Sequence, residues 1–294
     1  KGDVVSVYFS DETIQKFQGK VGNDIPAFSK HSVKKEWIVY EDDNLLIVYK
    51  PAGILSQKDS TDTDSINEML LDYIVKNGSL TAEKLSEYKP GICNRLDRNT
   101  AGLILFAKNA RASRELNVLL RERKIDKIYF AVVNGIMTEF IDSKLYLSKE
   151  EMGNIVRISE TPYNEESVPV HTDFTPVTHN TDLSLLRIRL HTGKSHQIRS
   201  VLAYLQHPIL GDPKYINADD RYALRNGYYR NLYHIHGQQL LAYALHFPKN
   251  CDGYFAYLSD RTFRSPIPAD FASVVSGEFD CKGDINAVME IPRA

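Results

Sequence analysis

Cysteine and long hydrophobic runs are both scarce in this sequence of 294 residues. The three cysteines, Cys93, Cys251 and Cys281, lie far apart and form no CxxC pair, which argues against a disulfide framework and against a zinc site. This usage fits a reducing compartment, and we therefore expect a cytoplasmic protein. No segment approaches the roughly 20 consecutive apolar residues that cross a bilayer, and no signal peptide is visible, so we expect no membrane partner.

An excess of positive charge is also absent. Lysine and arginine total 36 against 38 aspartates and glutamates, so the net charge is −2. Proteins that bind nucleic acid mainly through phosphates are usually basic. A nucleic-acid site on this chain must therefore be a local basic face that acidic surface elsewhere balances. The rest of the composition is that of an ordinary globular protein, long enough to bury a substantial core.

The common cofactor and nucleophile motifs are missing as well. The chain has no GxGxxG segment, P-loop, HExxH helix or GxSxG elbow. His234 and His236 are spaced like a pair of metal ligands, but no carboxylate or cysteine is placed to complete a site with them. We therefore expect no metal and no cofactor.

Apolar periodicity predicts strands and helices in the first part of the chain. Residues 36–54 are interpreted as a β-hairpin, because two β-rich runs flank an acidic stretch of turn-forming residues. A helix is predicted over 65–78, with Ser65 and Glu68 as its capping box and Gly78 at its end.

The mixture of strands and helices continues in the later segments. A second amphipathic helix is predicted over 112–124, and strands are predicted over 127–135 and 240–248. Residues 185–212 are interpreted as a strand, a tight turn and a helix with Ser195 as its N-cap. Strands and helices do not alternate regularly, and several neighbours look like hairpins. This pattern favours an α+β fold with a largely antiparallel sheet.

One charged segment stands directly before a strand destined for the core. Asp97 lies between Arg95 and Arg98, a few residues ahead of the hydrophobic run 103–107. The ordinary interpretation is a salt-bridged surface loop. The other is a carboxylate held between guanidinium groups at the edge of a site, where an ionised carboxylate can act as a nucleophile.

Two distant residues are candidate partners of Asp97. Arg199 lies about 100° around its helix from Ile198, at the rim of the apolar stripe, from where it can pair with Asp97 and keep it ionised. Tyr129, on the predicted strand 127–135, can offer an aromatic substrate a flat wall or a hydroxyl. Taken singly, such a tyrosine is more often a half-buried strand residue and such an arginine a surface residue.

Five segments resemble, in order, the motifs of one enzyme family. They are LLIVYKPAGI, NRLDRNTAGLILFAKN, KIYFAVVNG, LHTGKSHQIRSVLAYLQHPILGDPKY and LLAYALHFP. These segments are similar to the K-P-x-G strand, the H-R-L-D segment, the K-x-Y-x-A strand, the T-G-R-x-H-Q-I-R run and the L-H-A-x-x-L-x-F-P strand of the RluA type of RNA pseudouridine synthase. The resemblance covers roughly residues 37–271.

The resemblance implies an activity and a set of roles. The family isomerises uridine in RNA to pseudouridine without a cofactor or a metal. Its catalytic aspartate corresponds to Asp97, its active-site tyrosine to Tyr129, and the arginine that pairs with the aspartate to Arg199. Arg95 resembles the arginine that fills the stack vacated by a flipped base. The implied fold is one α+β domain, with a mixed, mainly antiparallel central sheet flanked by helices and loops.

Further basic residues are expected to contact RNA, either ribosomal or transfer RNA. They are Arg95 and Arg98 beside the aspartate, Lys194 and His196 ahead of Arg199, and Arg114, Arg121, Arg123 and Lys124 in the predicted helix 112–124. We expect the protein to be a monomer.

The resemblance also suggests a division of the chain. Residues 36–275 form the catalytic domain, residues 1–35 an N-terminal extension and residues 276–294 a C-terminal tail. Residues 2–9 resemble the last strand of an S4-type RNA-binding domain, so the extension is interpreted as a remnant of such a domain plus a linker.

Two other functions stay open at this point. Asn94 stands where the family usually has histidine, which keeps open an RNA-binding protein that has lost catalysis on the same scaffold. A glycoside hydrolase would need a second carboxylate about 5 to 9 Å from Asp97 in an open cleft. No such partner is apparent from the sequence.

Overall fold

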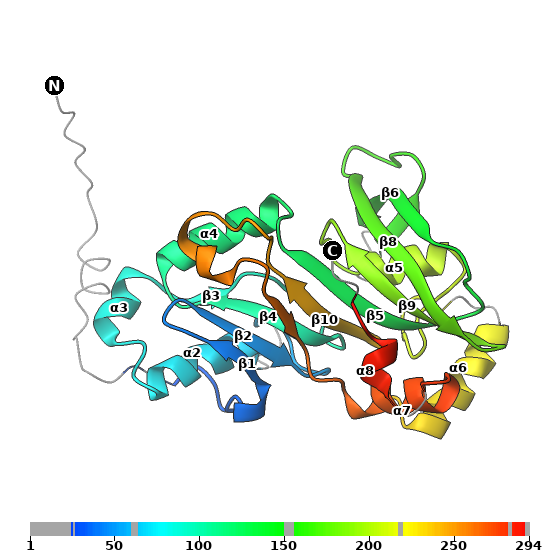
Figure 1. Ribbon diagram of the computed structural model, residues 1–294, viewed down its shortest axis with the longest axis horizontal. Coiled ribbons are helices and arrows are strands. Elements are labelled where there is room, and N and C mark those ends of the chain that lie inside the picture. Colours follow the sequence, from blue (N-terminus) through cyan, green and yellow to red (C-terminus); the bar gives the residue numbers. More distant parts are fainter. Residues whose placement is uncertain are drawn as a thin grey trace.

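The computed structural model describes residues 25, 27–59, 64–149, 156–216, 220–281 and 284–291, and these build one large twisted sheet with helices around it (Figure 1). Eleven strands of the described chain pair in the order β1-β2-β4-β10-β5-β9-β8-β6-β7, with β3 beside β4 and β11 beside β10. The pairing of β4 with β10 is parallel, whereas the other pairings are antiparallel. The mixed, mainly antiparallel sheet confirms the α+β fold. The strands are β1 (Ile38–Glu41), β2 (Leu45–Lys50), β3 (Gly91–Ile92), β4 (Ala101–Ala107), β5 (Asp126–Asn134), β6 (Ile141–Lys149), β7 (Val156–Ser159), β8 (Val168–His179), β9 (Leu183–Leu190), β10 (Leu240–His246) and β11 (Thr262–Arg264).

Helices pack around the sheet at several places. Near β1 to β4, α2 and α4 cover the sheet, whereas α6, α7 and α8 gather at the other end (Figure 1). The short helix α5 lies beside β7 and carries part of the site described below. The helices are η1 (Lys35–Trp37), α2 (Ile66–Lys76), α3 (Ala82–Glu87), α4 (Ala110–Arg121), α5 (Gln197–Tyr204), α6 (Asp220–Tyr233), η2 (Gly253–Leu258), α7 (Ala269–Glu278) and α8 (Ile285–Val288).

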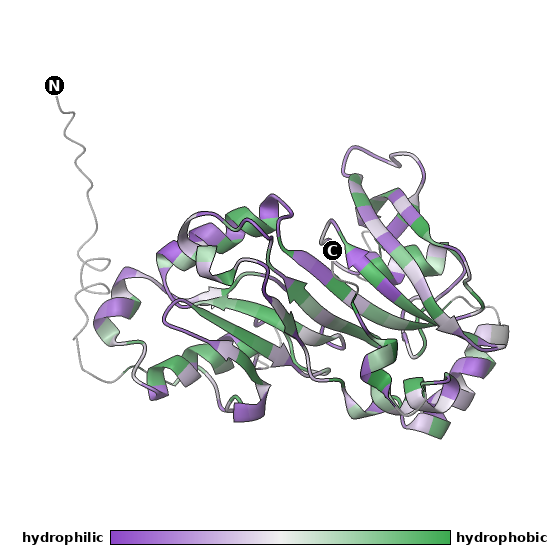
Figure 2. Cartoon of the chain, viewed as in Figure 1, coloured by the Kyte–Doolittle hydropathy of each residue, from purple (hydrophilic) through white to green (hydrophobic). Residues whose placement is uncertain are grey.

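The central strands are hydrophobic on both faces because both faces are covered. In β2, Leu46 and Val48 pack into the cluster that includes the inner side of α2, whereas Leu45 and Ile47 pack into the cluster under α4. All four side chains are fully buried. The same arrangement explains why β4 reads as an unbroken apolar run, which appears as the green centre of Figure 2. The charged segment around Asp97 is thereby attached to a fully buried strand of the core.

The hairpin and the first helix form as predicted, but the capping box does not. β1 and β2 pair antiparallel, and α2 runs over Ile66–Lys76 with Ser65 at its N-cap position. The Ser65 hydroxyl donates a hydrogen bond to the Glu68 carboxylate and makes no capping bond to the backbone. Gly78 follows the helix at φ +77°, the left-handed conformation expected at a helix end.

Two helix boundaries differ from the prediction. Helix α4 begins at Ala110, since the Asn109 side chain accepts a hydrogen bond of 2.8 Å from the Ala112 N–H. It ends at Arg121, so residues 123 and 124 lie beyond it. The residue before α5 is His196 rather than Ser195. His196 takes φ +57° and makes no side-chain capping bond.

The sequence pattern did not indicate β6, β7 and β8. These strands carry a mosaic of polar and apolar residues, visible as alternating colours in Figure 2. The predicted strand over 2–9 lies outside the described residues, and the division at 35 and 275 stays a prediction. None of the helices in the described ranges has the length and hydrophobicity of a membrane span.

Candidate active site

A cleft of about 890 Å³ opens beside the segment that contains Asp97. Its walls come from residues 93–100, from β5, from the turn at 193–196 and from the start of α5. The cleft therefore gathers segments that are about 100 residues apart in the chain. A volume of this size accommodates a nucleotide with part of its neighbours.

The loop that carries Asp97 is fixed by hydrogen bonds on several sides. The Ser56 hydroxyl donates to the Leu96 carbonyl at 2.7 Å and accepts from the Leu96 N–H at 2.9 Å. The buried Lys50 ammonium donates to the carbonyl of Arg98 at 3.0 Å, and the Thr100 N–H donates to the Asp97 carbonyl. The backbone on both sides of Asp97 is thus anchored to the core.

Asn94, which stands in place of the family histidine, also helps to anchor this loop to the core. Its side-chain oxygen accepts from the Leu105 N–H at 2.7 Å, and its amide donates to the Leu103 carbonyl at 3.3 Å. Both partners are in β4. The substitution therefore preserves a connection between the loop and the sheet.

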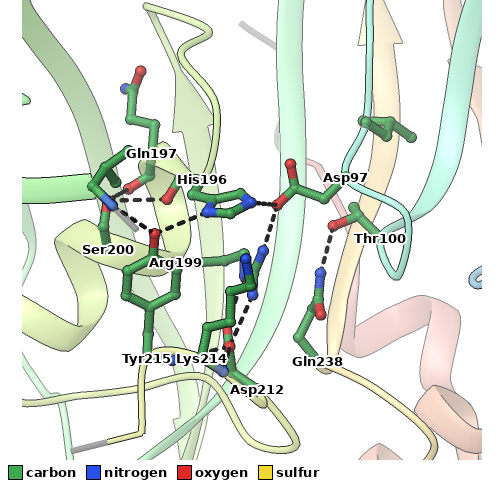
Figure 3. A network of polar contacts seen from close by, with 12 residues as sticks. Asp97, Thr100, His196, Gln197, Arg199, Ser200, Asp212, Lys214, Tyr215 and Gln238 are labelled. Atoms are coloured by element: carbon green, nitrogen blue, oxygen red, sulfur yellow. Dashed lines mark hydrogen bonds and ion pairs between the residues drawn. The ribbon is translucent and has the colours of Figure 1, made fainter. Parts of the chain in front are cut away.

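One arginine joins two carboxylates at the floor of the cleft (Figure 3). Arg199 Nη1 donates to Asp97 Oδ2 at 2.8 Å, while Nε and Nη2 donate to the two oxygens of Asp212 at 2.7 and 2.9 Å. The Asp212 side chain is fully buried, Arg199 is 5% exposed and Asp97 is 23% exposed. Burial disfavours the charge of Arg199, but the hydrogen bonds and charges of Asp212 and then Asp97 outweigh it, so its pKa is raised. Arg199 therefore remains a cation. It binds one oxygen of the Asp97 carboxylate and leaves the other oxygen available to the cleft.

The sequence predicted the Asp97–Arg199 pair but placed Arg199 at the rim of its helix. Arg199 is instead buried with the apolar residues Ile198 and Leu202 of α5. A buried guanidinium needs acceptors, and Asp212 provides two of them while Asp97 provides a third. Asp212, which the sequence analysis did not single out, is itself fixed because its Oδ1 accepts from the backbone N–H of Lys214 at 2.8 Å.

His196 lies beside the carboxylate as well. Its Nε2 is 4.0 Å from Asp97 Oδ2, and its Nδ1 is 2.8 Å from the Tyr215 hydroxyl (Figure 3). Burial lowers the pKa of His196, and the cations Arg199 and Lys214 add to this against the opposing effect of Asp97. A neutral imidazole therefore faces Asp97.

Two other side chains in the cleft are neutral. Tyr129 on β5 is 7% exposed, and burial, followed by the negative charge of Asp97, raises the pKa of its phenol well above the usual range. Burial raises the pKa of the Cys93 thiol to about 11, which excludes it as a ready nucleophile. Asp97 is thus the anionic group beside Tyr129 in this part of the cleft.

The predicted RNA-contacting residues fall into two groups. Arg95, Lys194, His196 and Arg121 line the cleft, together with Lys127, which the sequence analysis did not include. The remaining four point elsewhere. Arg98 Nε donates to the Gly53 carbonyl at 3.1 Å, and Lys124 pairs with Glu122 at 2.8 Å. Arg123 lines a separate hollow with Lys144 and His171, and Arg114 is exposed on α4 outside the cleft lining.

Asp212 does not supply the second acid that a paired-carboxylate hydrolase needs. Asp212 is the carboxylate that shares Arg199 with Asp97, but its side chain is fully buried and its oxygens are occupied by Arg199 and backbone N–H groups. It cannot reach a glycosidic bond in the cleft.

The fold is shared with proteins named as RNA pseudouridylate synthases. The human RNA pseudouridylate synthase domain containing 4 has a similar fold, with a TM-score of 0.60 at 18% identity over 82% of this chain and 92% of the human one. The family described as RNA pseudouridylate synthase matches residues 44–204. The chain belongs to this family, which confirms the RluA type predicted from the five motifs.

Two curated relatives have related sequences. An uncharacterised RNA pseudouridine synthase of Mycoplasma genitalium is 31% identical over 78% of this chain and 70% of its own length. The ribosomal large subunit pseudouridine synthase D of Borreliella burgdorferi is 30% identical over 62% of this chain. The chain spans about half, 55%, of the length of this second relative.

Proposed function

We propose that this pseudouridine synthase acts on ribosomal RNA and that Asp97 carries out the central step. The observation that carries the proposal is a partly exposed carboxylate in a cleft, held by a buried arginine that a second, inaccessible carboxylate anchors. The similarity to a synthase named for the ribosomal large subunit supports this choice of RNA over transfer RNA.

The reaction breaks the C1′–N1 bond of uridine and forms a C1′–C5 bond, after which the hydrogen on C5 is lost as a proton and N1 ends with a proton taken up in its place. The uracil must detach, turn and reattach in one pocket without exchanging with solvent. Asp97 acts at the sugar, either as nucleophile or as base. Arg199 orients the Asp97 carboxylate through the 2.8 Å hydrogen bond, and no cofactor is needed for these steps.

The target uridine has to leave its stack before it can reach Asp97. Flipping a base costs a few kcal/mol, which new contacts must offset. Tyr129 stacks on the flipped uracil, a kind of contact worth ~1–3 kcal/mol per base. Arg95, exposed at the wall of the cleft, fills the vacated place in the stack. Arg121, Lys127 and Lys194 then contact the flanking phosphates.

The intact geometry speaks against the alternative of an RNA-binding protein without catalysis. That alternative rested on Asn94, and its side chain anchors the loop to β4 without entering the Asp97–Arg199–Asp212 network. A monomeric state and a cytoplasmic location stay predictions.

The choice of RNA is tested with RNA carrying tritium at uracil C5, since formation of the new carbon–carbon bond expels that hydrogen. Large-subunit ribosomal RNA, small-subunit ribosomal RNA and transfer RNA are labelled separately and taken from cells that lack this enzyme. We expect stoichiometric release from the large-subunit RNA alone. Release only from transfer RNA would contradict the choice of substrate while leaving the chemistry intact.

A further inference from the structure

A cluster of two histidines and two aspartates lies on the face of the sheet opposite the cleft. His171 and Asp173 are on β8, Asp142 is on β6 and His191 directly follows β9. Leu190, the neighbour of His191, lines the cleft, and side chains alternate between faces along a strand. The cluster is therefore separate from the site around Asp97.

The ring nitrogens of this cluster converge on the carboxylates. The two imidazoles are stacked, with centroids 3.9 Å apart and planes inclined by 13°. His171 Nε2 is 2.6 Å from Asp142 Oδ1 and 3.4 Å from Asp173 Oδ1, and His191 Nε2 is 2.7 Å from Asp173 Oδ2. One ligand atom each from His171, Asp173 and His191 falls within 4.8 Å of the others.

Two carboxylates of the cluster face each other across a strand pair. Asp142 and Asp173 are direct partners in the register of β6 and β8, and like charges opposite each other destabilise a sheet. Lys144 pairs with Oδ2 of Asp142 at 2.7 Å, which leaves Oδ1 facing His171. A cation bound at Asp173 would offset part of this repulsion.

We propose that His171, Asp173 and His191 bind a divalent transition-metal ion, with water completing its coordination, and that Zn²⁺ matches this donor set best. Zinc takes imidazole nitrogen at about 2.0–2.1 Å and carboxylate oxygen at about 2.0–2.2 Å, so the ligand atoms of a tetrahedral site lie about 3.3 Å apart. The nitrogen–oxygen contacts of 2.7 and 3.4 Å between Asp173 and the two histidines are close to this spacing. Mg²⁺ and Ca²⁺ prefer sites made of oxygen alone.

The ion would fasten two neighbouring strands together. It connects β8 to the end of β9, from which the chain runs through the turn at 191–196 into α5 and Arg199. The side chains of His171, Asp173 and His191 are 26%, 19% and 23% exposed, so an ion can enter from solvent. The role is structural, because the cluster has no access to the cleft. No metal was expected from the sequence, because these residues do not have the spacing of a metal-binding motif along the chain. Only the register of the strands brings them together.

The test is a metal titration of the full chain after treatment with a chelator. Zn²⁺ binding is followed by calorimetry, and Co²⁺ binding by the visible absorption of a tetrahedral site. We expect one ion per chain for the wild type. His171→Ala and His191→Ala should each weaken binding about tenfold or more. His179→Ala, on the same strand but outside the cluster, is the matched control and should bind like the wild type.

A second variant tests whether a loss of metal binding is caused by misfolding. Asp173→Asn keeps the size and shape of the side chain but removes its charge, and circular dichroism checks that it folds. Zn²⁺ should raise the thermal unfolding midpoint of the wild type and leave that of Asp173→Asn unchanged. The proposal is overturned if the stripped wild type binds no Zn²⁺ at micromolar concentration, or if His171→Ala and Asp173→Asn bind it as the wild type does.

Discussion

At the scale of single residues, the site depends on one guanidinium that joins two carboxylates. The pairing of Asp97 with Arg199 was predictable, because both residues stand in recognisable segments and an ionised carboxylate needs a cationic partner. Asp212 was not singled out, although it lies in one of the matched segments. An aspartate between glycine and proline in a loop looks like ordinary turn chemistry, and only the burial of Arg199 shows why a second acid is required.

Removing Arg199 should therefore affect stability as well as catalysis. Arg199→Ala leaves the Asp212 carboxylate buried without its partner, and breaking such a pair typically costs about 3–5 kcal/mol. Urea unfolding followed by circular dichroism measures the loss. Arg189→Ala is the matched control. Arg189 forms a half-exposed pair with Asp126, and its removal should cost no more than about 1 kcal/mol. Equal losses for the two variants would contradict the buried network.

Lys50 is a second residue whose role became clear only in the structure. It is fully buried, and its ammonium donates to the carbonyls of Pro51, Ile54 and Arg98 at 2.8 to 3.0 Å. Burial lowers the pKa of Lys50 to about 7, against the opposing charge of Asp97. The lysine thus ties the loop of Asp97 to the end of β2.

This lowered pKa gives Lys50 a defined effect on stability. Its folded-state pKa lies below the unfolded value of about 10.4, so between pH 7 and pH 10 the unfolded chain holds a proton that the folded protein has released. The free energy of unfolding should therefore rise with pH in this window, by up to ~1.4 kcal/mol per pH unit. Lys50→Met should remove this contribution. Urea unfolding at pH 7, 8 and 9 checks it, and identical slopes for wild type and variant would refute it.

At the scale of elements, the sequence predicts the strands and helices whose apolar residues follow the spacing of one type of secondary structure. β2, β4, β5 and β10 are dense in buried apolar residues, and α2 has a clear apolar face, so each was recognised. β8 was missed because it is half exposed and contains Pro169 and Pro176, which usually exclude a strand. Its position is set by pairing with β6 and β9, which no local pattern records.

The junction of β4 with β10 sets a strict steric requirement. Gly102 takes φ +132°, and a Cβ on it would lie 2.3 Å from the carbonyl oxygen of Ala242. Gly102→Ala should therefore destabilise the protein by more than ~3 kcal/mol, as measured by chemical unfolding. In Gly227→Ala, within α6, the new methyl group meets nothing within 4 Å, so this control should be neutral or stabilising by up to ~1 kcal/mol. A tolerated alanine at 102 would contradict the close strand pairing.

Helix α4 separates two arginines that look equivalent in the sequence. Arg121 lines the cleft, whereas Arg114 is exposed elsewhere on the helix. Arg121→Ala should weaken RNA binding and reduce the slope of log affinity against log salt concentration by about 1, because one phosphate contact is lost. Arg114→Ala should change neither quantity. Filter binding at several salt concentrations distinguishes the two, and equal slopes for both variants would argue against this orientation of the RNA.

At the scale of the whole molecule, a nearly neutral chain places several basic side chains around one cleft. The net charge is −2, yet Arg95, Arg121, Lys127 and Lys194 line one cleft. The sequence predicted a local basic face, but four of the eight residues assigned to it lie outside the cleft lining. Which of them reach the cleft depends on helix rotation and on where α4 ends, and neither follows from composition. The family assignment, by contrast, was available from the order of five motifs.

The central claim is that the Asp97 carboxylate performs the chemistry, whereas Arg199 and Asp212 only hold it in place. The most direct measurement is tritium release from total cellular RNA labelled at uracil C5, with the wild type and with Asp97→Asn, alongside RNA binding by both proteins. We expect full release by the wild type, none by Asp97→Asn, and similar RNA affinity for the two. Release by Asp97→Asn at the wild-type rate would contradict the account, because the reaction would then proceed without this carboxylate.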